Sequence, residues 1–377
     1  MPAAIHLDLS ELVARPLRSG IQRIEREAIR HWPGPAPLVP CCVDNEGRFL
    51  RLPQAVLDVL CAEDDDSPAA REAERLALTD LASSAAPLQS DAVERLLNLE
   101  LFSAASRADT HVRFAAAGVR VLWYLCDFLP FLRPDMFEPG TSRHCMHFLR
   151  GLRAAHRVAF LSEQTRHDFT QHIVRNAPPE AIGPVLMPGA DGFRLEQQTF
   201  SPGRRDFVTI GTVEPRKNPD ALLSAFEMLW QAGTAARLVV AGRISPDAQV
   251  ARAFFERHAN NPNLVVLDQP SDETLRKVLR RARIVVMASE AEGFGLPPYE
   301  ALHAGIPAIA SVMLPSVTSL PGGVMLLERM DAASISAAVA SLLDDAAASR
   351  LWREAGDMRL PTWESFSHEL GDWAQAA

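Results

Sequence analysis

The 377-residue sequence lacks several features that would assign it to a membrane or nucleic-acid-binding class. It has no apolar run of the roughly 18 to 20 residues that a bilayer-spanning helix needs. Its N-terminal segment carries an acidic residue at Asp8 and has no apolar signal-peptide core. A formal net charge of −9 gives no general attraction to nucleic acid, so no nucleic-acid partner is expected. We therefore expect a cytoplasmic protein, with peripheral contact at the cytoplasmic face of the inner membrane left open.

The sequence also lacks the patterns typical of metal sites and disulfide frameworks. No strand-end Asp-x-Asp pair is present, and the run Asp64–Asp66 follows no strand, so we interpret it as a solvated turn and expect no metal. The cysteines are odd in number and have no metal-type spacing, which favours reduced thiols. They are Cys41, Cys42, Cys61, Cys126 and Cys145.

Glycine is absent between Gly47 and Gly118, where alanine, leucine and acidic residues are abundant, and this composition favours helices. Elsewhere, short apolar strands alternate with helical patterns in both halves, which predicts an α/β fold with parallel sheets. A chain of this length is expected to form two domains. We place them at 1–192 and 206–360, joined by a polar linker at 195–205.

The most informative stretch runs from Ile284 to Ser311. A buried strand is followed by a turn containing Gly293 and Gly295, and two prolines then favour a helix start. The helix should end near residue 303, before a second short strand. Glycines let backbone approach a ligand, and the N–H groups of Phe294 to Leu296 can bind an anion.

Two carboxylates, Glu292 and Glu300, bracket this turn with seven residues between them. A carboxylate only accepts hydrogen bonds, so each suits a pair of hydroxyls on a sugar or ribose. The alternative is an ordinary strand–loop–helix crossover with two surface glutamates.

Arg216 and Lys217 follow the strand predicted at 207–213. Asn218 is a suitable N-cap and Pro219 a suitable first residue for the next helix. The two cationic side chains thus sit at a helix start, where they favour a phosphate. Arg243 ends the following strand and should extend the same edge of the sheet. The alternative is a loop with exposed basic residues.

Candidate ligand residues in the first half are sparser. Gly20 lies in a basic loop that leads from the first strand into a helix, which suits a phosphate or sugar, although an exposed basic helix is the commoner case. Asp127 follows the strand predicted at 119–126, where it serves either the acceptor or a structural loop cap. A helix predicted at 141–156 places basic residues on one face. This face suits an acceptor pyrophosphate or an anionic membrane surface, or it is an ordinary solvated helix face. They are Arg143, His147, Arg150 and Arg153.

The stretch EGFGLPPYEALHAGIPAIAS resembles the Glu-seven-Glu signature of retaining family 4 glycosyltransferases with the GT-B fold. This resemblance implies two Rossmann-like domains facing across a cleft, with a C-terminal helix at about 361–377 crossing back to the first. It also implies that Arg216 and Lys217 hold the donor diphosphate. Glu300 would bind the ribose and Glu292 the transferred sugar.

The same resemblance implies retaining transfer of a hexose, with a lean toward mannose, from a GDP- or UDP-linked donor. The acceptor would be a glycan or lipid-linked saccharide in surface polysaccharide or lipopolysaccharide synthesis. No cofactor or metal would be required, because two cations already neutralise the diphosphate. The base would lie near 267–271. Catalytic roles are expected for Glu292, Asp127, Arg216 and Lys217, and donor binding also for Gly20, Arg243 and Gly293–Leu296.

One departure from the family keeps other functions open. Relatives often have histidine before the aspartate, facing the reacting sugar, and this chain has Cys126 there. This departure motivates a non-catalytic nucleotide-sugar-binding protein as an alternative. A sugar-nucleotide epimerase or phosphorylase could share the same architecture, and the basic helix predicted at 141–156 suggests a peripheral membrane scaffold.

Overall fold

A computed structural model describes residues 3–34, 36–62, 67–137 and 140–377. The chain divides into two compact units: unit 1 comprises residues 1–189 and 361–377, and unit 2 comprises residues 190–360. The aspartate run at 64–66, which we interpret as a solvated turn, lies outside the described residues. None of the helices described is both long and apolar enough to cross a membrane.

Unit 2 is built on a six-stranded sheet in which every pairing is parallel, in the order β11-β10-β9-β12-β13-β14. The strands are short and rich in Val, Ile and Leu, as expected for strands covered on both faces. Their bounds are β9 Asp206–Ile210, β10 Arg237–Ala241, β11 Leu264–Leu267, β12 Ala282–Met287, β13 Ala308–Ser311 and β14 Val324–Leu327.

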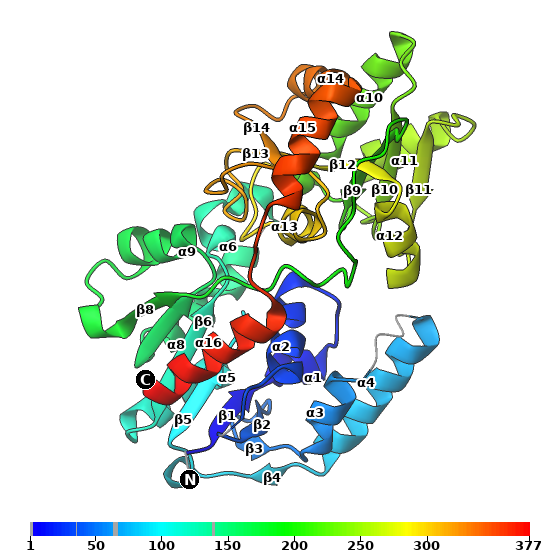
Figure 1. The fold of residues 1–377 in the computed structure, drawn as a ribbon. Coiled ribbons are helices and arrows are strands. Elements are labelled where there is room, and N and C mark those ends of the chain that lie inside the picture. The colour runs from blue at the N-terminus through cyan, green and yellow to red at the C-terminus, as the bar shows by residue number, and fades with distance from the viewer. Residues whose placement is uncertain (1–2, 35, 63–66, 138–139) are drawn as a thin grey trace. The chain divides into compact units, whose positions relative to one another are not determined.

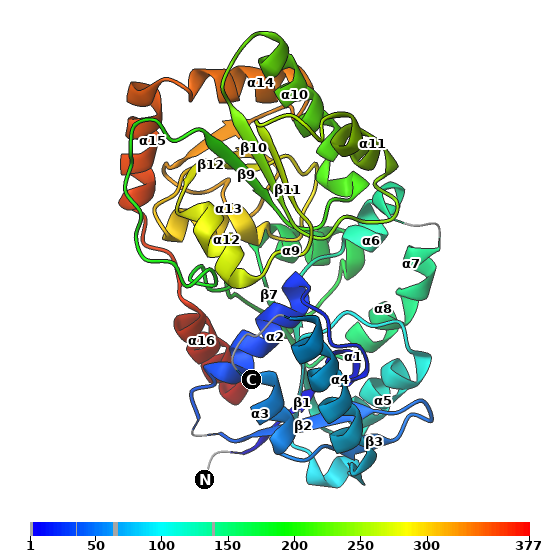
Figure 2. The same cartoon turned by 90° about the vertical axis from the view of Figure 1, so that its right-hand side faces the viewer.

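Helices cover both faces of this sheet (Figure 2). Alternate residues of β9 separate the two layers: Phe207 packs with α10, α11 and α14, whereas Val208 packs with α12, α13 and α15. This alternation follows from the two-residue period of a strand. The helix bounds are α10 Pro219–Gln231, α11 Gln249–Arg257, α12 Asp272–Leu279, α13 Leu296–His303, α14 Ala332–Ser341 and α15 Asp345–Gly356.

Unit 1 contains an eight-stranded sheet in the order β4-β3-β2-β1-β5-β6-β7-β8. The six strands from β2 to β8 pair in parallel, and β3 and β4 add an antiparallel edge. The bounds are β1 Ile5–Asp8, β2 Leu38–Val43, β3 Phe49–Arg51, β4 Ala86–Pro87, β5 Arg95–Asn98, β6 Arg120–Leu125, β7 Arg157–Phe160 and β8 Ile182–Val185.

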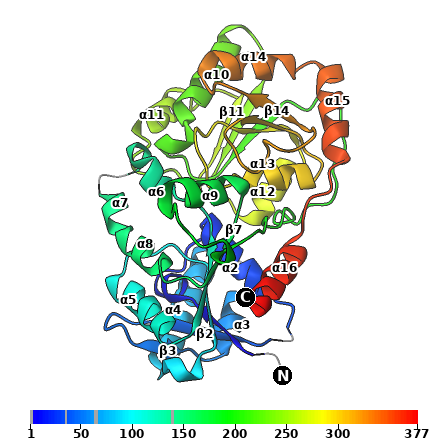
Figure 3. The same cartoon turned by 90° about the vertical axis from the view of Figure 1, so that its left-hand side faces the viewer.

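The helices of unit 1 also form two layers. On one face α5 and α8 lie side by side (Figure 3) over Trp123 and Val121 of β6. On the other, α16 lies against α2 (Figure 1), and the ring of Tyr124 meets that of Phe366 at 5.5 Å. The bounds are α1 Ser10–Ala14, α2 Gly20–Arg30, α3 Ala55–Leu60, α4 Pro68–Ser83, α5 Ala105–Ala116, α6 Leu129–Leu132, α7 Thr141–His144, α8 Met146–Leu152, α9 Glu163–Asp168 and α16 Trp363–Ala376.

The predicted fold class, two α/β domains with parallel sheets, is confirmed, but three local predictions differ from the structure. The glycine-free region holds β5, a central strand, besides the expected helices. The helix predicted at 141–156 is two short helices, α7 and α8, separated at Cys145. The segment predicted as a linker at 195–205 groups with unit 2, because Leu195 is buried in its core and Phe200 packs beside it.

Candidate active site

The candidate site of unit 2 lies where β9 and β12 end. These strands are parallel neighbours, with Phe207 opposite Ile284 and Val208 opposite Val285. Parallel neighbours end at the same edge of a sheet, so the loops that follow them emerge together. The loop after β9 leads through a short 3-10 turn, Pro215–Lys217, into α10. The loop after β12 carries residues 288–295 and leads into α13.

Arg216 and Glu292 join the two loops directly. Arg216 Nη1 donates to Glu292 Oε2 at 2.7 Å and to the carbonyl of Ala291 at 3.0 Å. Arg216 Nη2 donates to Glu214 Oε1, also at 2.7 Å. Ser289 Oγ donates to the second carboxylate oxygen of Glu292 at 2.8 Å, so both oxygens of Glu292 are held. Two residues chosen independently from sequence, 76 positions apart, therefore meet in one ion pair.

The electrostatic balance keeps this guanidinium charged. Burial alone would lower the pKa of Arg216, but Glu292 and Glu214 outweigh burial and raise the pKa above its ordinary value. The side chain is 19% exposed, so it is accessible from one side. An incoming phosphate would have to share Arg216 with these carboxylates or displace one of them.

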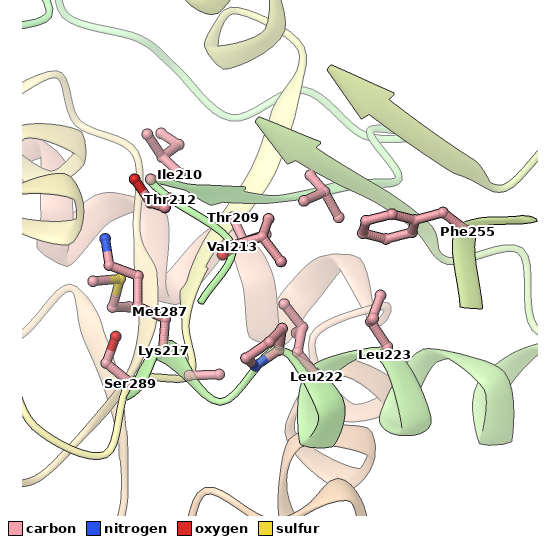
Figure 4. Close-up of a pocket in the computed structure, with 14 residues that line it drawn as sticks. Thr209, Ile210, Thr212, Val213, Lys217, Leu222, Leu223, Phe255, Met287 and Ser289 are labelled. Carbon is pink, nitrogen blue, oxygen red and sulfur yellow. The ribbon is translucent and has the colours of Figure 1, made fainter. Parts of the chain in front are cut away.

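Lys217 lies on the other side of the same carboxylate, with Nζ 4.0 Å from Glu292 Oε1. It lines a pocket together with Thr212, Met287 and Ser289 (Figure 4). Gly211 makes room for it: a β-carbon at this position would overlap Lys217 Nζ. Gly211 also has φ of +123°, a region that side chains other than glycine rarely adopt.

Replacing Gly211 with alanine should therefore displace the Lys217 ammonium and weaken nucleoside diphosphate binding by about tenfold, the loss of one charge-assisted contact. Isothermal titration calorimetry with UDP and GDP measures this. Gly233→Ala is the matched control, because Gly233 has φ of +75° but open space around its missing side chain. Equal affinities for the two variants would contradict the steric role of Gly211.

The start of α13 offers fewer backbone donors than the sequence pattern suggests. Pro297 and Pro298 have no N–H, so only Leu296 and Tyr299 keep one among the first four helical residues. Gly295 precedes the helix with φ of +91°, and a β-carbon there would come within 2.9 Å of the Leu314 side chain. Any anion binding at this turn thus depends mainly on the loop amides up to Leu296.

The remaining residues predicted for the donor differ in accessibility. Glu300 is 1% exposed on the buried side of α13. The ring of Phe294 is buried against Tyr299 at 5.1 Å, and its carbonyl accepts the N–H of Ser316 at 3.0 Å. Arg243 is exposed just after β10, and the bridge between Val213 and Ile244 carries the loop after β9 alongside it. Donor contacts of these residues stay predictions.

Asn218 does not cap α10 as predicted. It occupies the N-cap position with φ of 53°, in the left-handed region, and its side chain makes no capping hydrogen bond. Instead Asn218 Nδ2 donates to the carbonyl of Met330 at 2.7 Å. This contact ties the turn that carries Arg216 and Lys217 to the segment before α14.

Asp127 and Gly20 both belong to unit 1. Asp127 Oδ1 accepts the backbone N–H of Leu129 at 2.9 Å, which is the structural loop cap that we weighed against an acceptor role. Gly20 is the first residue of α2, and the side chain of Ser19 caps that helix through the N–H of Gln22. Cys126 is buried, and burial raises the pKa of its thiol well above the ordinary value, so it stays neutral.

The basic patch predicted on one long helix is not formed as such, because α7 and α8 divide its residues. Arg150 pairs with Asp109 of α5. Arg153 directly follows α8 and lines a pocket with Arg120 and Arg157, where β6 and β7 of the unit 1 sheet begin.

Sequence reasoning missed three residues of the unit 2 site, namely Gly211, Glu214 and Ser289. Gly211 lies inside the strand predicted at 207–213, and a glycine inside a strand is a usable signal for close backbone approach. No sequence signal pointed to Glu214 or Ser289, because their roles depend on contacts that form only in the folded loops.

Comparisons with known proteins show that the residues of this site lie in a stretch that matches a family model. Residues 193–359, most of unit 2, match the family model for glycosyl transferases group 1. The chain is 30% identical over 216 residues to the serotype-specific mannosyltransferase WbdA of Escherichia coli, covering 52% of this chain and 26% of WbdA. It is 34% identical over 166 residues to O-antigen chain mannosyltransferase B of Escherichia coli, covering 42% of each. The chain thus spans less than half the length of either relative.

Solved structures match the whole chain. Sucrose-phosphate synthase from Thermosynechococcus elongatus aligns with a TM-score of 0.70 and 14% identity, covering 100% of this chain and 99% of that one. WaaG, a glycosyltransferase involved in lipopolysaccharide biosynthesis, aligns with a TM-score of 0.63 and 14% identity over 99% and 100% of the two chains. At this identity the likeness defines the fold, which is the GT-B fold of glycosyltransferases.

Proposed function

We propose that the chain is a retaining glycosyltransferase of family 4. It would transfer a hexose from a nucleoside diphosphate sugar to a glycan or lipid-linked acceptor in surface polysaccharide synthesis. The observation that supports this most strongly is the meeting of Arg216, Lys217 and Glu292 at one sheet edge. The family match over the same residues supports it independently. Mannose is the favoured sugar, since both relatives described above are mannosyltransferases by name.

In the proposed reaction the two cations act on the leaving group. The bond between the anomeric carbon and the donor phosphate oxygen breaks, and negative charge develops on the diphosphate, where Arg216 and Lys217 stabilise it. The acceptor oxygen bonds to the anomeric carbon from the same face, and its proton passes to the leaving phosphate oxygen. Glu292 would contact the transferred sugar. The described residues hold no cluster of side chains suited to a metal, and the proposal requires none.

A thermal-shift screen of nucleoside diphosphates and their sugars tests the donor class. A ligand present at about one hundred times its dissociation constant stabilises the folded state by about 2.7 kcal/mol, which raises the melting temperature by several degrees. We expect GDP or UDP and the corresponding sugar to do so. The matching nucleosides are the control, because they lack the phosphates. A melting temperature unchanged by every diphosphate would refute the donor site.

Product analysis separates transfer from the alternatives. Incubation with a labelled sugar nucleotide and a glycan acceptor should yield labelled glycan and free nucleoside diphosphate. A free epimer or sugar phosphate as the sole product would favour an epimerase or phosphorylase. Donor binding without turnover would favour a non-catalytic binding protein, which the neutral Cys126 in place of the family histidine makes worth testing.

A further inference from the structure

Unit 1 contains a buried cluster of ionisable side chains where β1 and β5 end, which the donor site does not use. Asp8 ends β1, and Glu100 lies two residues beyond the end of β5. Arg107 and His111 project from α5, and Glu25 from α2. Their exposed fractions are 0% for Asp8, 0% for Glu25, 3% for Glu100, 1% for Arg107 and 0% for His111.

Asp8 is well compensated within this cluster. Arg107 Nε donates to Asp8 Oδ2 at 2.8 Å, and His111 Nε2 lies 2.8 Å from the same oxygen. Burial lowers the pKa of His111, despite Asp8 beside it, so the imidazole is neutral near pH 7 and donates its Nε2–H. Arg107 therefore carries the only fixed positive charge among the five side chains.

Glu100 holds the backbone that follows β1. Its carboxylate accepts the N–H of Glu11 at 2.9 Å and the N–H of Leu12 at 2.6 Å. It also lies 2.5 Å from Arg107 Nη2. Further along this segment, Gln22 Nε2 donates to the carbonyl of Arg15 at 2.9 Å, and Gln22 Oε1 accepts the N–H of Leu17. Side chains thus hold the segment at residues 11, 12, 15 and 17.

Glu25 has no such compensation. Both of its carboxyl oxygens are buried, and neither accepts a hydrogen bond from any donor in the described residues. Its carboxyl group lies within hydrogen-bonding reach of the Glu100 carboxyl, whose negative charge acts on Glu25 more strongly than the positive charge of Arg107 does. Three carboxyls and one cation in a buried site cannot all stay ionised, because an uncompensated buried charge costs several kcal/mol. Glu25 therefore carries a proton.

We propose that Glu25 and Glu100 share one proton and together act as a positioning pair for residues 9–20. The protonated carboxyl of one donates to the carboxylate of the other, which leaves Glu100 in place to hold Glu11 and Leu12. Loss of that proton puts two negative charges side by side in a buried site and loosens the segment. The segment leads into Gly20, so its effect on ligands rests on the proposed function, whereas the shared proton does not.

The sign of the pH dependence follows from the direction of these shifts. Burial raises the pKa of both Glu25 and Glu100 above the ordinary value. The native state therefore binds more protons than the unfolded chain, and stability falls as pH rises from about 4.3 through the raised native values. Other groups facing the pair are Glu11 of α1, Arg26 of α2, Cys42 of β2 and Cys126 after β6. Arg26 stays charged, and burial keeps both thiols neutral. These groups therefore do not contribute to the loss of stability with rising pH.

Hydrogen–deuterium exchange of the full-length protein tests the proposal without any ligand. Protection of peptides covering residues 9–20, corrected for intrinsic exchange, should fall by about tenfold between about pH 6 and about pH 9. In Glu25→Gln the amide donates to Glu100 at every pH, so protection should stay constant and the melting temperature at alkaline pH should exceed that of the wild type.

Glu27→Gln is the matched control, since Glu27 lies on the same helix but pairs with Arg30 at 2.5 Å. It should keep the wild-type pH profile for residues 9–20. If Glu25→Gln and the wild type show the same pH profile, the shared proton is refuted. Should the variant fail to fold, the wild-type profile alone decides, because a flat profile also refutes the proposal. Failure of the donor screen would leave this test unaffected.

Discussion

Arg216→Ala should lower the rate of donor turnover by about 10²- to 10³-fold, the range found when one preorganised charge on a developing anion is removed. In this structure the change also frees Glu292 and Glu214 from their shared partner, so both carboxylates would repel the diphosphate. Hydrolysis of a labelled sugar nucleotide measures turnover even when the acceptor is unknown. The melting temperature should change little, because Arg216 is partly exposed.

Arg281→Ala is the matched control for this prediction. Arg281 is an exposed arginine of the same unit, but it immediately precedes β12 and so lies at the opposite edge of the sheet. The Arg281→Ala variant should turn over the donor at the wild-type rate. Arg216→Lys should remain impaired, because an ammonium cannot reproduce the forked contacts of the guanidinium. Wild-type turnover in Arg216→Ala would contradict the assigned role.

Arg107→Leu should cost about 3 to 5 kcal/mol of unfolding free energy, because it leaves buried carboxylates without their cation. Burial alone would raise the pKa of Asp8, but Arg107 and His111 outweigh it and hold the pKa well below its usual range. The ionised form of Asp8 thus stabilises the fold above its ordinary pKa, and this contribution is lost as pH falls toward the depressed native value. Urea titration at neutral pH measures the loss.

The exposed pair of Arg48 and Asp44 provides the comparison. The guanidinium lies 2.7 Å from the carboxylate, but the arginine side chain is 62% exposed. Arg48→Ala should therefore cost less than about 1 kcal/mol. A similar small loss for Arg107→Leu would mean that the buried cluster contributes far less than its contacts indicate.

The sequence predicted unit 2 better than unit 1, for physical reasons. In unit 2, β10 and β11 each end in a continuous apolar run that is followed by glycine or aspartate, so their positions are evident locally. In unit 1, β5 has only four residues inside a helix-favouring composition, and it is a strand because it pairs with β1 and β6 on either side. Such pairing overrides local propensity and is not evident from one segment.

The candidate site shows the same limit. Arg216, Lys217 and Glu292 could be chosen from their positions after strands, but their mutual contacts could not. The carboxylate of Glu214 beside Arg216, and the space that Gly211 leaves for Lys217, depend on how two loops meet. Likewise, the sequence shows that Pro297 and Pro298 have no N–H group. Only the structure shows that the helix begins at Leu296, so that its first turn has few N–H groups for an anion.

Comparison of nucleoside diphosphate with monophosphate binding tests the central claim most directly. By calorimetry, the wild-type protein should bind GDP or UDP at least about tenfold more tightly than the matching monophosphate, since the second phosphate adds charge-assisted contacts. The double variant Arg216→Ala/Lys217→Ala should lose this advantage while keeping residual affinity for the base and ribose. An unchanged preference for the diphosphate in the double variant would contradict the assignment of these two residues to the donor diphosphate.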